Sequence, residues 1–345
     1  MGSGWNILVR GFALGPVGWD DGVEVPTVFV HDNDGTVWIE DCTIEGRLGA
    51  AHFNGVGFDL RAGSPAVQVG NDVTTLQPLT TVTLQRCTLT GGDGISSSQP
   101  FGADTGASSG GPALVTIGAS VSLHDCTLQG GTAGTGIYFA VPADGGDGAL
   151  LKQSCLVFFA GCDVRGGDNA SNGPLGGFAD GPGNGLTLAQ TNCQGVLRDS
   201  SFAPGTVVPH GTPGVAIQSP PFTLYSLPAA ARSFSVTSPV QEGAPGSVLV
   251  DGQPGDFALL IVASDATEFL MTTNQGMLIA NPFPVLHLLA LGPTDASGDL
   301  ALGFTTPTLP ASVSGLTLFM QLVLQSGDGV TLEAGSAFVW LDGSL

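Results

Sequence analysis

The stretch VTLQRCTLTGGDG, residues 82–94, alternates β-forming with polar residues around one cysteine and then runs into glycines. Nearly the same string, VSLHDCTLQGGTAG, recurs at 121–134. Counted from the cysteine, a hydrophobic residue stands at −5, −3 and +2, and a glycine at +4. The pattern surrounds four cysteines, and degenerate copies centre on Phe12 and Ser200, at intervals of 30 to 45 residues. Such a period indicates structural units that stack on one another.

A second recurring element precedes each copy of the pattern. It begins at or beside a proline or glycine and then alternates apolar with polar residues, which is typical of a half-buried strand. The segments are PTVFV (26–30), PAVQV (65–69), PALVTI (112–117), GALLKQ (148–153), NGLTLA (184–189) and PGVAIQ (213–218). Each repeat is therefore predicted to be a circuit of short strands joined by turns.

The spacing inside the pattern predicts a bend. Positions −5 and −3 share one face of a strand, whereas 0 and +2 share the other, so a straight strand would expose half of them. A corner at −2 and −1 lets all four side chains point inward. We therefore expect each repeat to be one coil of a solenoid.

With these coils, the chain resembles the right-handed parallel β-helix proteins, the architecture of pectate lyases, polygalacturonases and many bacterial surface proteins. The resemblance covers about residues 5–225 and depends on the repeat and its corners. It implies an all-β fold in which residues 1–225 form a parallel β-helix with long Gly-rich loops.

The six cysteines are predicted to be structural. Stacked coils place position zero of each repeat over the next at a spacing of ~4.8 Å, and cysteine packs as a small hydrophobic residue. A metal site is disfavoured because there are no C-x-x-C pairs and no nearby histidine. The expected core ladder comprises Cys42, Cys87, Cys126 and Cys162.

The remaining two cysteines occupy matching positions in consecutive coils. Cys155 lies seven residues before Cys162, and Cys193 lies seven residues before Ser200. Neighbouring coils bring such positions within disulfide range. We predict a disulfide between Cys155 and Cys193, and the alternative is two more buried thiols.

Residues 226–345 carry no copy of the repeat. Seven or eight short apolar or alternating runs are separated by turn residues, which predicts an antiparallel β-sandwich. This part resembles the small C-terminal β domains that close many large secreted bacterial proteins, most clearly in PTDASGDLAL (293–302). The resemblance implies a role in export, sorting or attachment.

Composition narrows the function classes. Gly (54) and Pro (23) are abundant, which disfavours long helices. The net charge is −21 with 8 Lys and Arg, so the chain offers no basic groove for nucleic acid and would be repelled by anionic membrane surfaces. No apolar run reaches the ~18 residues that span a bilayer. Other copies of the chain, cell-surface proteins and glycans remain as expected partners.

The residues that a β-helix enzyme needs are not found as a set. The polygalacturonase cluster of N-x-D, D-D, G-H-G and R-x-K is not present as an ordered set. A pectate-lyase site needs an arginine beside calcium-binding aspartates. Here Arg86, Arg165 and Arg198 share related corner slots with acidic residues, and the simpler interpretation is solvated ion pairs between coils. The acidic residues are Asp41, Asp125 and Asp199.

Two groups of acidic residues are weak calcium candidates. VHDNDGTV (30–37) contains a D-x-D-G fragment with Asp32 and Asp34, although an Asx turn explains it equally. The Gly-rich loops start at the same point of each coil and should cluster their acids on one flank, where they would hold calcium or a glycan, or simply be solvated. These acids are Asp93, Asp104, Asp144, Asp147, Asp168 and Asp180. No other cofactor is expected.

The sequence favours a non-catalytic structural or adhesive scaffold at the cell surface or outside the cell. The copy at 7–14 starts inside a coil, and an uncapped coil exposes unpaired backbone groups. We therefore expect a longer parent protein or a neighbouring subunit to cover it, the latter giving head-to-tail assembly through the first coil and the sandwich. The alternatives are a polysaccharide lyase or glycoside hydrolase in the β-helix groove, and a calcium-dependent glycan-binding module.

Overall fold

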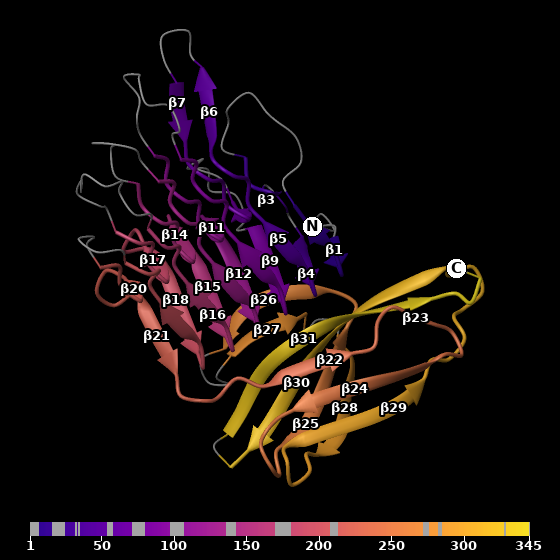
Figure 1. The fold of residues 1–345 in the computed structure, drawn as a ribbon. Helices are drawn as coiled ribbons and strands as arrows, with labels where there is room; N and C mark the ends of the chain where they lie inside the picture. Colours follow the sequence, from indigo (N-terminus) through magenta and orange to yellow (C-terminus); the bar gives the residue numbers. More distant parts are fainter. Residues whose placement is uncertain are drawn as a thin grey trace.

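The computed structural model describes residues 7–15, 25–31, 33, 35–53, 58–70, 80–96, 107–135, 143–169, 181–207, 213–271, 276–281, 285–327 and 329–344. The described residues form strands and turns, with no helix among them, and therefore no helix that could cross a membrane. Long parallel sheets dominate the N-terminal two thirds (Figure 1). This arrangement is compatible with a β-helix or another solenoid-like fold.

Three parallel sheets make up what we call the parallel region, residues 7–227. Sheet A contains β1 (Ile7–Arg10), β4 (Thr36–Glu40), β9 (Thr80–Gln85), β12 (Ala119–His124), β15 (Leu156–Ala160), β18 (Gln194–Arg198) and β21 (Leu224–Leu227). Sheet B contains β2 (Ala13–Leu14), β5 (Thr43–Glu45), β10 (Thr88–Thr90), β13 (Thr127–Gln129), β16 (Asp163–Arg165) and β19 (Ser201–Ala203). Sheet C contains β3 (Val28–Val30), β8 (Val67–Val69), β11 (Leu114–Ile117), β14 (Ala149–Lys152), β17 (Leu186–Leu188) and β20 (Ile217–Gln218). The chain visits C, A and B in turn.

The corner between sheets A and B is the same in every coil. The residue just before position zero has positive φ, a left-handed conformation that turns the chain sharply. Glycine or aspartate occupies five of these six corners, and Arg86 occupies the other. The corner residues are Gly11, Asp41, Arg86, Asp125, Gly161 and Asp199.

The inward-facing side chains form continuous rows along the coils. In sheet A, Val37 pairs with Val82, which pairs with Val121; in sheet B, Ile44 pairs with Leu89, which pairs with Leu128. These residues are buried in one core cluster that spans the parallel region. Each coil thus completes its core only against the coils on either side.

The connections from sheet B to sheet C are the longest in each coil, and we call them the insertions. Glycines lie at their bases, next to the strands. In one column, each glycine N–H donates to the glycine carbonyl of a neighbouring arm: Gly111 to Gly92 (2.7 Å), Gly131 to Gly111 (2.8 Å) and Gly146 to Gly131 (2.8 Å). A Cβ at Gly146 would lie 2.0 Å from the Gly111 carbonyl oxygen, so no larger residue fits. The connection from β5 to β8 carries the hairpin β6 (Ala50–Phe53) and β7 (Phe58–Arg61).

A second set of sheets, which we call the antiparallel region, follows β21. One sheet contains β22 (Ser233–Val236), β24 (Pro245–Asp251) and β29 (Asp299–Thr305). The other contains β23 (Val240–Gln241), β31 (Gly329–Leu341), β30 (Gly315–Ser326), β25 (Phe257–Ala263) and β28 (Val285–Pro293), and its pairs are antiparallel except β23 with β31. A hairpin of β26 (Ala266–Met271) and β27 (Gly276–Ala280) lies beside them.

The antiparallel region packs on the outer face of sheet A (Figure 1). Trp38 and Phe158 point out of the coils and are buried in a cluster with Met277, Ile279 and Phe319. The rings of Trp38 and Phe319 have centroids 5.3 Å apart. The outer face of sheet A is therefore an internal interface, and the insertions leave from the corner that sheet A does not touch.

Candidate functional site

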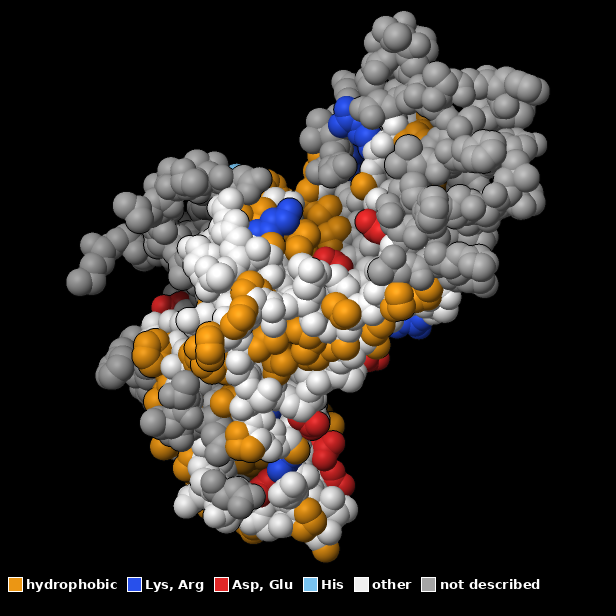
Figure 2. All heavy atoms as spheres, turned by 90° about the vertical axis from the view of Figure 1, so that its left-hand side faces the viewer, with side chains coloured by type: hydrophobic (Ala, Val, Ile, Leu, Met, Phe, Trp, Pro, Cys, Tyr) orange, Lys and Arg blue, Asp and Glu red, His pale blue; other side chains and the backbone are white. Residues whose placement is uncertain are grey.

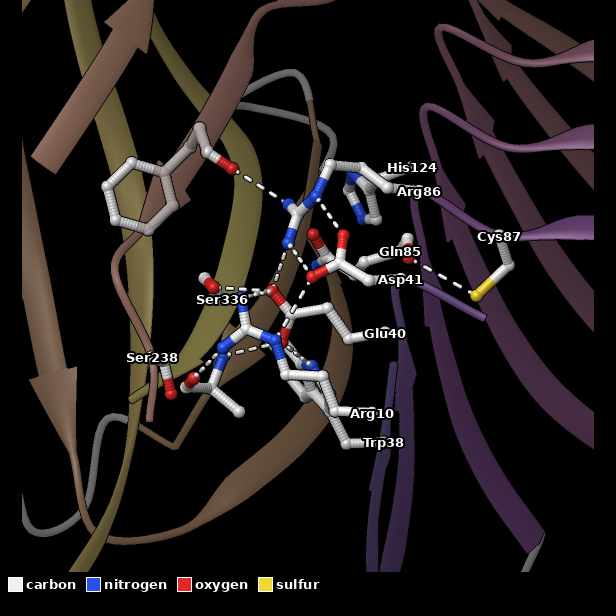
Figure 3. A network of polar contacts seen from close by, with 12 residues as sticks. Arg10, Trp38, Glu40, Asp41, Gln85, Arg86, Cys87, His124, Ser238 and Ser336 are labelled. Carbon is white, nitrogen blue, oxygen red and sulfur yellow. Dashed lines mark hydrogen bonds and ion pairs between the residues drawn. The ribbon is translucent and has the colours of Figure 1, made fainter. Parts of the chain in front are cut away.

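A network of polar contacts joins the two regions and centres on the buried carboxylate of Glu40 (Figure 3). Glu40 lies at the end of β4 and accepts hydrogen bonds from the Ser336 hydroxyl, from the Ala337 N–H (3.0 Å) and from the Trp38 indole (3.2 Å). Arg86 also donates to Glu40. One carboxylate from the coils thus receives donors from both regions.

Two arginines complete this interface network. Arg86 donates to Asp41 (2.7 Å) and to the Phe234 carbonyl (3.0 Å). Arg10 donates to Asp41 (3.0 Å) and to the carbonyl of Ala337 (3.0 Å). The arginines hold the pKa of Asp41 below its usual value, although its partial burial opposes this. The interpretation of ion pairs between coils applies to Arg86 and Asp41, but both arginines also bind the antiparallel region.

Arg198 departs from that interpretation, because it is not solvated. Its side chain is fully buried in an ion pair with Glu333 of β31, and it donates to the Leu332 carbonyl (2.9 Å). Burial lowers the pKa of Arg198 and raises the pKa of Glu333, in each case against the charged form. The cost of removing both charges from water therefore offsets much of the electrostatic attraction between the two side chains.

A third polar contact comes from Glu268 of the β26–β27 hairpin. Its carboxylate accepts hydrogen bonds from the hydroxyls of Thr83 (3.0 Å), Ser120 (2.8 Å) and Ser122 (2.8 Å) on sheet A, and from the Ser122 N–H (3.2 Å). Burial nevertheless raises the pKa of Glu268 to about 7. Glu268 therefore fixes the hairpin to β9 and β12.

Between these contacts lie polar groups that no partner satisfies in the described structure. Gln85 and His124 are neighbours in sheet A, and both are buried. The side-chain amide of Gln85 and the two ring nitrogens of His124 form no hydrogen bond to a described residue. Burial, with the charge of Arg198, lowers the pKa of His124 to about 3. Burial raises the pKa of Asp125 to about 6. His124 is therefore neutral at physiological pH.

A groove of about 490 Å³ runs along the bases of the insertions. Its walls come from the arms that lead into β11, β14, β17 and β20, so it crosses successive coils. Glycine and proline dominate its lining, with Asp144 and Asp147 as its carboxylates. Such a groove could receive an extended polymer chain, but it presents no arginine or lysine among its described residues.

Three of the four loop acids that the structure describes use their carboxylates to connect coils. Asp147 accepts the N–H of Asn184 (2.8 Å), and Asn184 accepts the N–H of Val215 (2.9 Å) at the same corner one coil later. Asp93 accepts the N–H of Thr132 (2.7 Å), and Asp168 accepts that of Thr206 (2.6 Å). No group of three or more metal-ligating side chains occurs in the described ranges. Asp32, Asp34, Asp104 and Asp180 lie outside them.

The structure places the four ladder cysteines directly before paired residues of sheet B. Thr43 pairs with Thr88, which pairs with Thr127, which pairs with Asp163. The four thiols are buried and free, and the Cys87 N–H lies 3.4 Å from the Cys126 Sγ. Ser200 continues the row, where its hydroxyl accepts the Cys162 N–H (3.0 Å).

Cys155 and Cys193 are also buried, in adjacent coils. Their flanking backbones are hydrogen-bonded, from the Gln194 N–H to the Cys155 carbonyl (2.8 Å). A hydrogen bond between the two thiols raises the pKa of Cys155 and lowers that of Cys193. The structure has the two residues as thiols, and the disulfide stays a prediction.

Sequence reasoning missed the interface of sheet A. A signal was present, because Trp38 and Phe158 stand at −4 of the repeat, between two inward positions, and so had to point outward. Two large aromatic side chains on an outer face indicate that the face is covered. Nothing in the repeat indicates that residues beyond 230 cover it.

Comparisons with known proteins give little further guidance. No protein-family model and no curated protein matches the chain. One solved structure similar to part of it is the superoxide reductase (neelaredoxin) from Ignicoccus hospitalis, with 12% sequence identity over 32% of this chain and 80% of that one and a TM-score of 0.20. A likeness at this TM-score carries no inference about fold or function.

Proposed function

We propose that the chain is a non-catalytic extracellular scaffold. In this proposal the parallel region is a right-handed parallel β-helix, the antiparallel region is a β-sandwich that braces it along sheet A, and the insertions form a flank for contact with surface proteins or glycans. Sheet A, which contacts the antiparallel region, and the insertions lie on different sides of each coil. A partner can therefore bind the insertions without disturbing the contact between the two regions.

The observation that supports this proposal is the use of the ionisable groups. Arg86, Arg198 and Glu268 near sheet A connect the two regions, and three of the four described loop acids bond one coil to the next through their carboxylates. Catalytic groups need a cavity in which they reach a substrate. In this chain the arginines and carboxylates that connect the regions are already engaged by backbone and side-chain partners, and His124, whose ring nitrogens bond to no described residue, is buried.

The groove favours one second candidate, a module that binds a glycan or another polymer without turnover. It runs along the coils and exposes the carboxylate of Asp144, and burial raises the pKa of Asp147. Among the described residues that line the groove, these two carboxylates are the ones that a lyase or hydrolase could use. Asp147, however, already accepts the Asn184 N–H, as Asn184 does from Val215.

Incubation with a panel of acidic and neutral polysaccharides, with and without calcium, tests the proposal. We expect no new reducing ends beyond those from a D144N/D147N variant, in which the amide introduced at position 147 would copy the role of Asn184. D163N is the matched control, since Asp163 is an exposed carboxylate outside the groove. Turnover that D163N keeps and D144N/D147N loses would establish an enzyme. Binding without turnover, lost only in D144N/D147N, would establish the glycan-binding module, and labelling of intact producing cells tests the extracellular location.

A further inference from the structure

The parallel region ends in an open coil. β19, β20 and β21 each pair with a strand on one side only in the described part of the chain. The same is true of β1, β2 and β3 at the opposite end. Exposed strand edges of this kind bind other strands unless something protects them.

The inward rows are less completely buried in the first and last coils than in the coils between them. Phe202, Ile217 and Leu224 continue the inward rows but are only partly buried, whereas their partners in the preceding coil include the fully buried Val164 and Leu186. At the other end Val9, Leu14 and Val28 are likewise partly buried against the core. The last coil therefore exposes core residues that one more coil would cover, and the described residues of the first coil present inward rows of the same kind.

The open end of the last coil lacks the usual protection by charge. Residues 200–231 contain no Asp, Glu, Lys or Arg, in a chain whose net charge is −21. Figure 2 faces this end and shows hydrophobic side chains gathered across it. Among the described residues of the first coil, 7–15 and 25–30, Arg10 is the one charged side chain, and it is bound to Asp41 and Glu40.

Phe222 is the most informative residue at this end. It lies at the corner between β20 and β21, is 94% exposed, and has a φ of 64°. Gly70 and Gly118 have positive φ at the same corner of inner coils. A bulky residue in this conformation is strained, and no burial within one copy compensates for it. Contact with a partner would compensate.

We propose that the last coil of one copy stacks on the first coil of a second copy, so that sheets A, B and C continue from one molecule into the next. Stacking would place Phe202 on Leu14, Ile217 on Val28 and Leu224 on Ile7, and each row would stay hydrophobic. The antiparallel region lies along sheet A and leaves this end uncovered in Figure 1. The contact joins two different surfaces, so it propagates into a filament.

Strand direction favours this head-to-tail contact over pairing of two last coils. A copy shifted along the axis presents its three edges in the same order and direction as the inner coils do. Two last coils face to face would run antiparallel and bring sheet B over sheet C. The inference goes beyond the proposed scaffold function, because stacking does not depend on what the flank binds. Association and polysaccharide binding are measured separately.

Sedimentation velocity and light scattering across protein concentrations, at low and physiological salt, test the proposal with the full chain. We expect a growing series of species, promoted by salt because screening reduces the repulsion between copies of charge −21. F222N should weaken association about tenfold or more. Its monomer should be as thermally stable as the wild type or more so, because asparagine tolerates positive φ. F269N, which removes an exposed phenylalanine of the hairpin, should leave association unchanged.

A second variant tests the strand edge itself. The Thr223 carbonyl accepts the N–H of Gly195 in β18. Because alternate residues of a strand form their backbone hydrogen bonds on opposite sides, Ser226 turns its N–H to the open side. S226P should therefore reduce association, and S226A should not. A monomer at every concentration, a dimer that does not grow, or wild-type association of both F222N and S226P would each overturn the proposal.

Discussion

The two faces of sheet A are built on different principles. The inner face repeats, with hydrophobic residues at the same positions in most coils and a cysteine directly after the corner in four of them. The outer face changes from coil to coil, from Trp38 and Glu40 to Thr83 and Gln85, then Ser122 and His124, then Phe158, and finally Arg198. The inner face is satisfied by its own copies, whereas the outer face is satisfied by distant segments. Regular stacking and specific docking therefore share one set of strands.

The largest effect is expected on the outer face, from R198M. This change leaves Glu333 as a buried carboxylate without its partner, which costs about 3 to 5 kcal/mol. R198M/E333M should recover most of the loss, because burial already opposes both charged forms. Urea unfolding of the two variants and the wild type measures this. A double variant as unstable as R198M would show that the pair itself stabilises the docked arrangement.

The inner face should respond to L128A, the removal of a fully buried side chain from the middle of a row. A cavity of this kind costs about 3 kcal/mol. Differential scanning calorimetry should show that the unfolding temperature of the parallel region falls most, because Leu128 belongs to the core of the coils. Equal effects on both regions would mean that they unfold as one unit. L249A, at a half-exposed leucine of the antiparallel region, is the control and should cost much less.

A smaller, pH-dependent effect is expected from Glu268. Its pKa of about 7 in the folded protein lies above the ordinary 4.5, so the docked hairpin binds a proton that the free hairpin releases. Its contribution to stability is complete below pH ~4.5 and is lost as the pH rises through 7. The loss is about 2 kcal/mol, less than the full pKa change implies because the side chain is partly exposed.

Unfolding measured at pH 5 and pH 8 checks this prediction: the change in stability from pH 5 to pH 8 should be more favourable in E268Q than in the wild type, because the loss caused by Glu268 is removed. His124 contributes with the opposite sign. Its pKa is lowered to about 3, so its stabilising effect is complete above pH 6.5 and falls as the pH drops toward 3. The two groups are separated by comparing E268Q with H124F, which keeps the aromatic contact with Phe158. A wild-type slope in E268Q would assign the effect to another group.

Much of the parallel region could be predicted from the sequence. The repeat around Cys87 and Cys126 contains the inward rows, the corner and the position of the insertions, because each coil meets a near-copy of itself at one fixed offset. The corner residues Asp41, Asp125 and Asp199 indicate the bend, since aspartate tolerates positive φ. The sequence left the roles of the loop acids open, and the structure shows three of the four described ones, Asp93, Asp147 and Asp168, bonding one coil to the next.

What the sequence alone determined about this protein is its β character, its repeat and the parallel stacking of its coils, because all of these depend on local alternation and on contacts between equivalent positions. Only the tertiary structure decided that Arg198 is buried, that Glu40 and Glu268 connect two regions, and that the last coil is left open. These contacts join residues 100 to 300 positions apart and occur once each. No period in the sequence records a contact that is made only once.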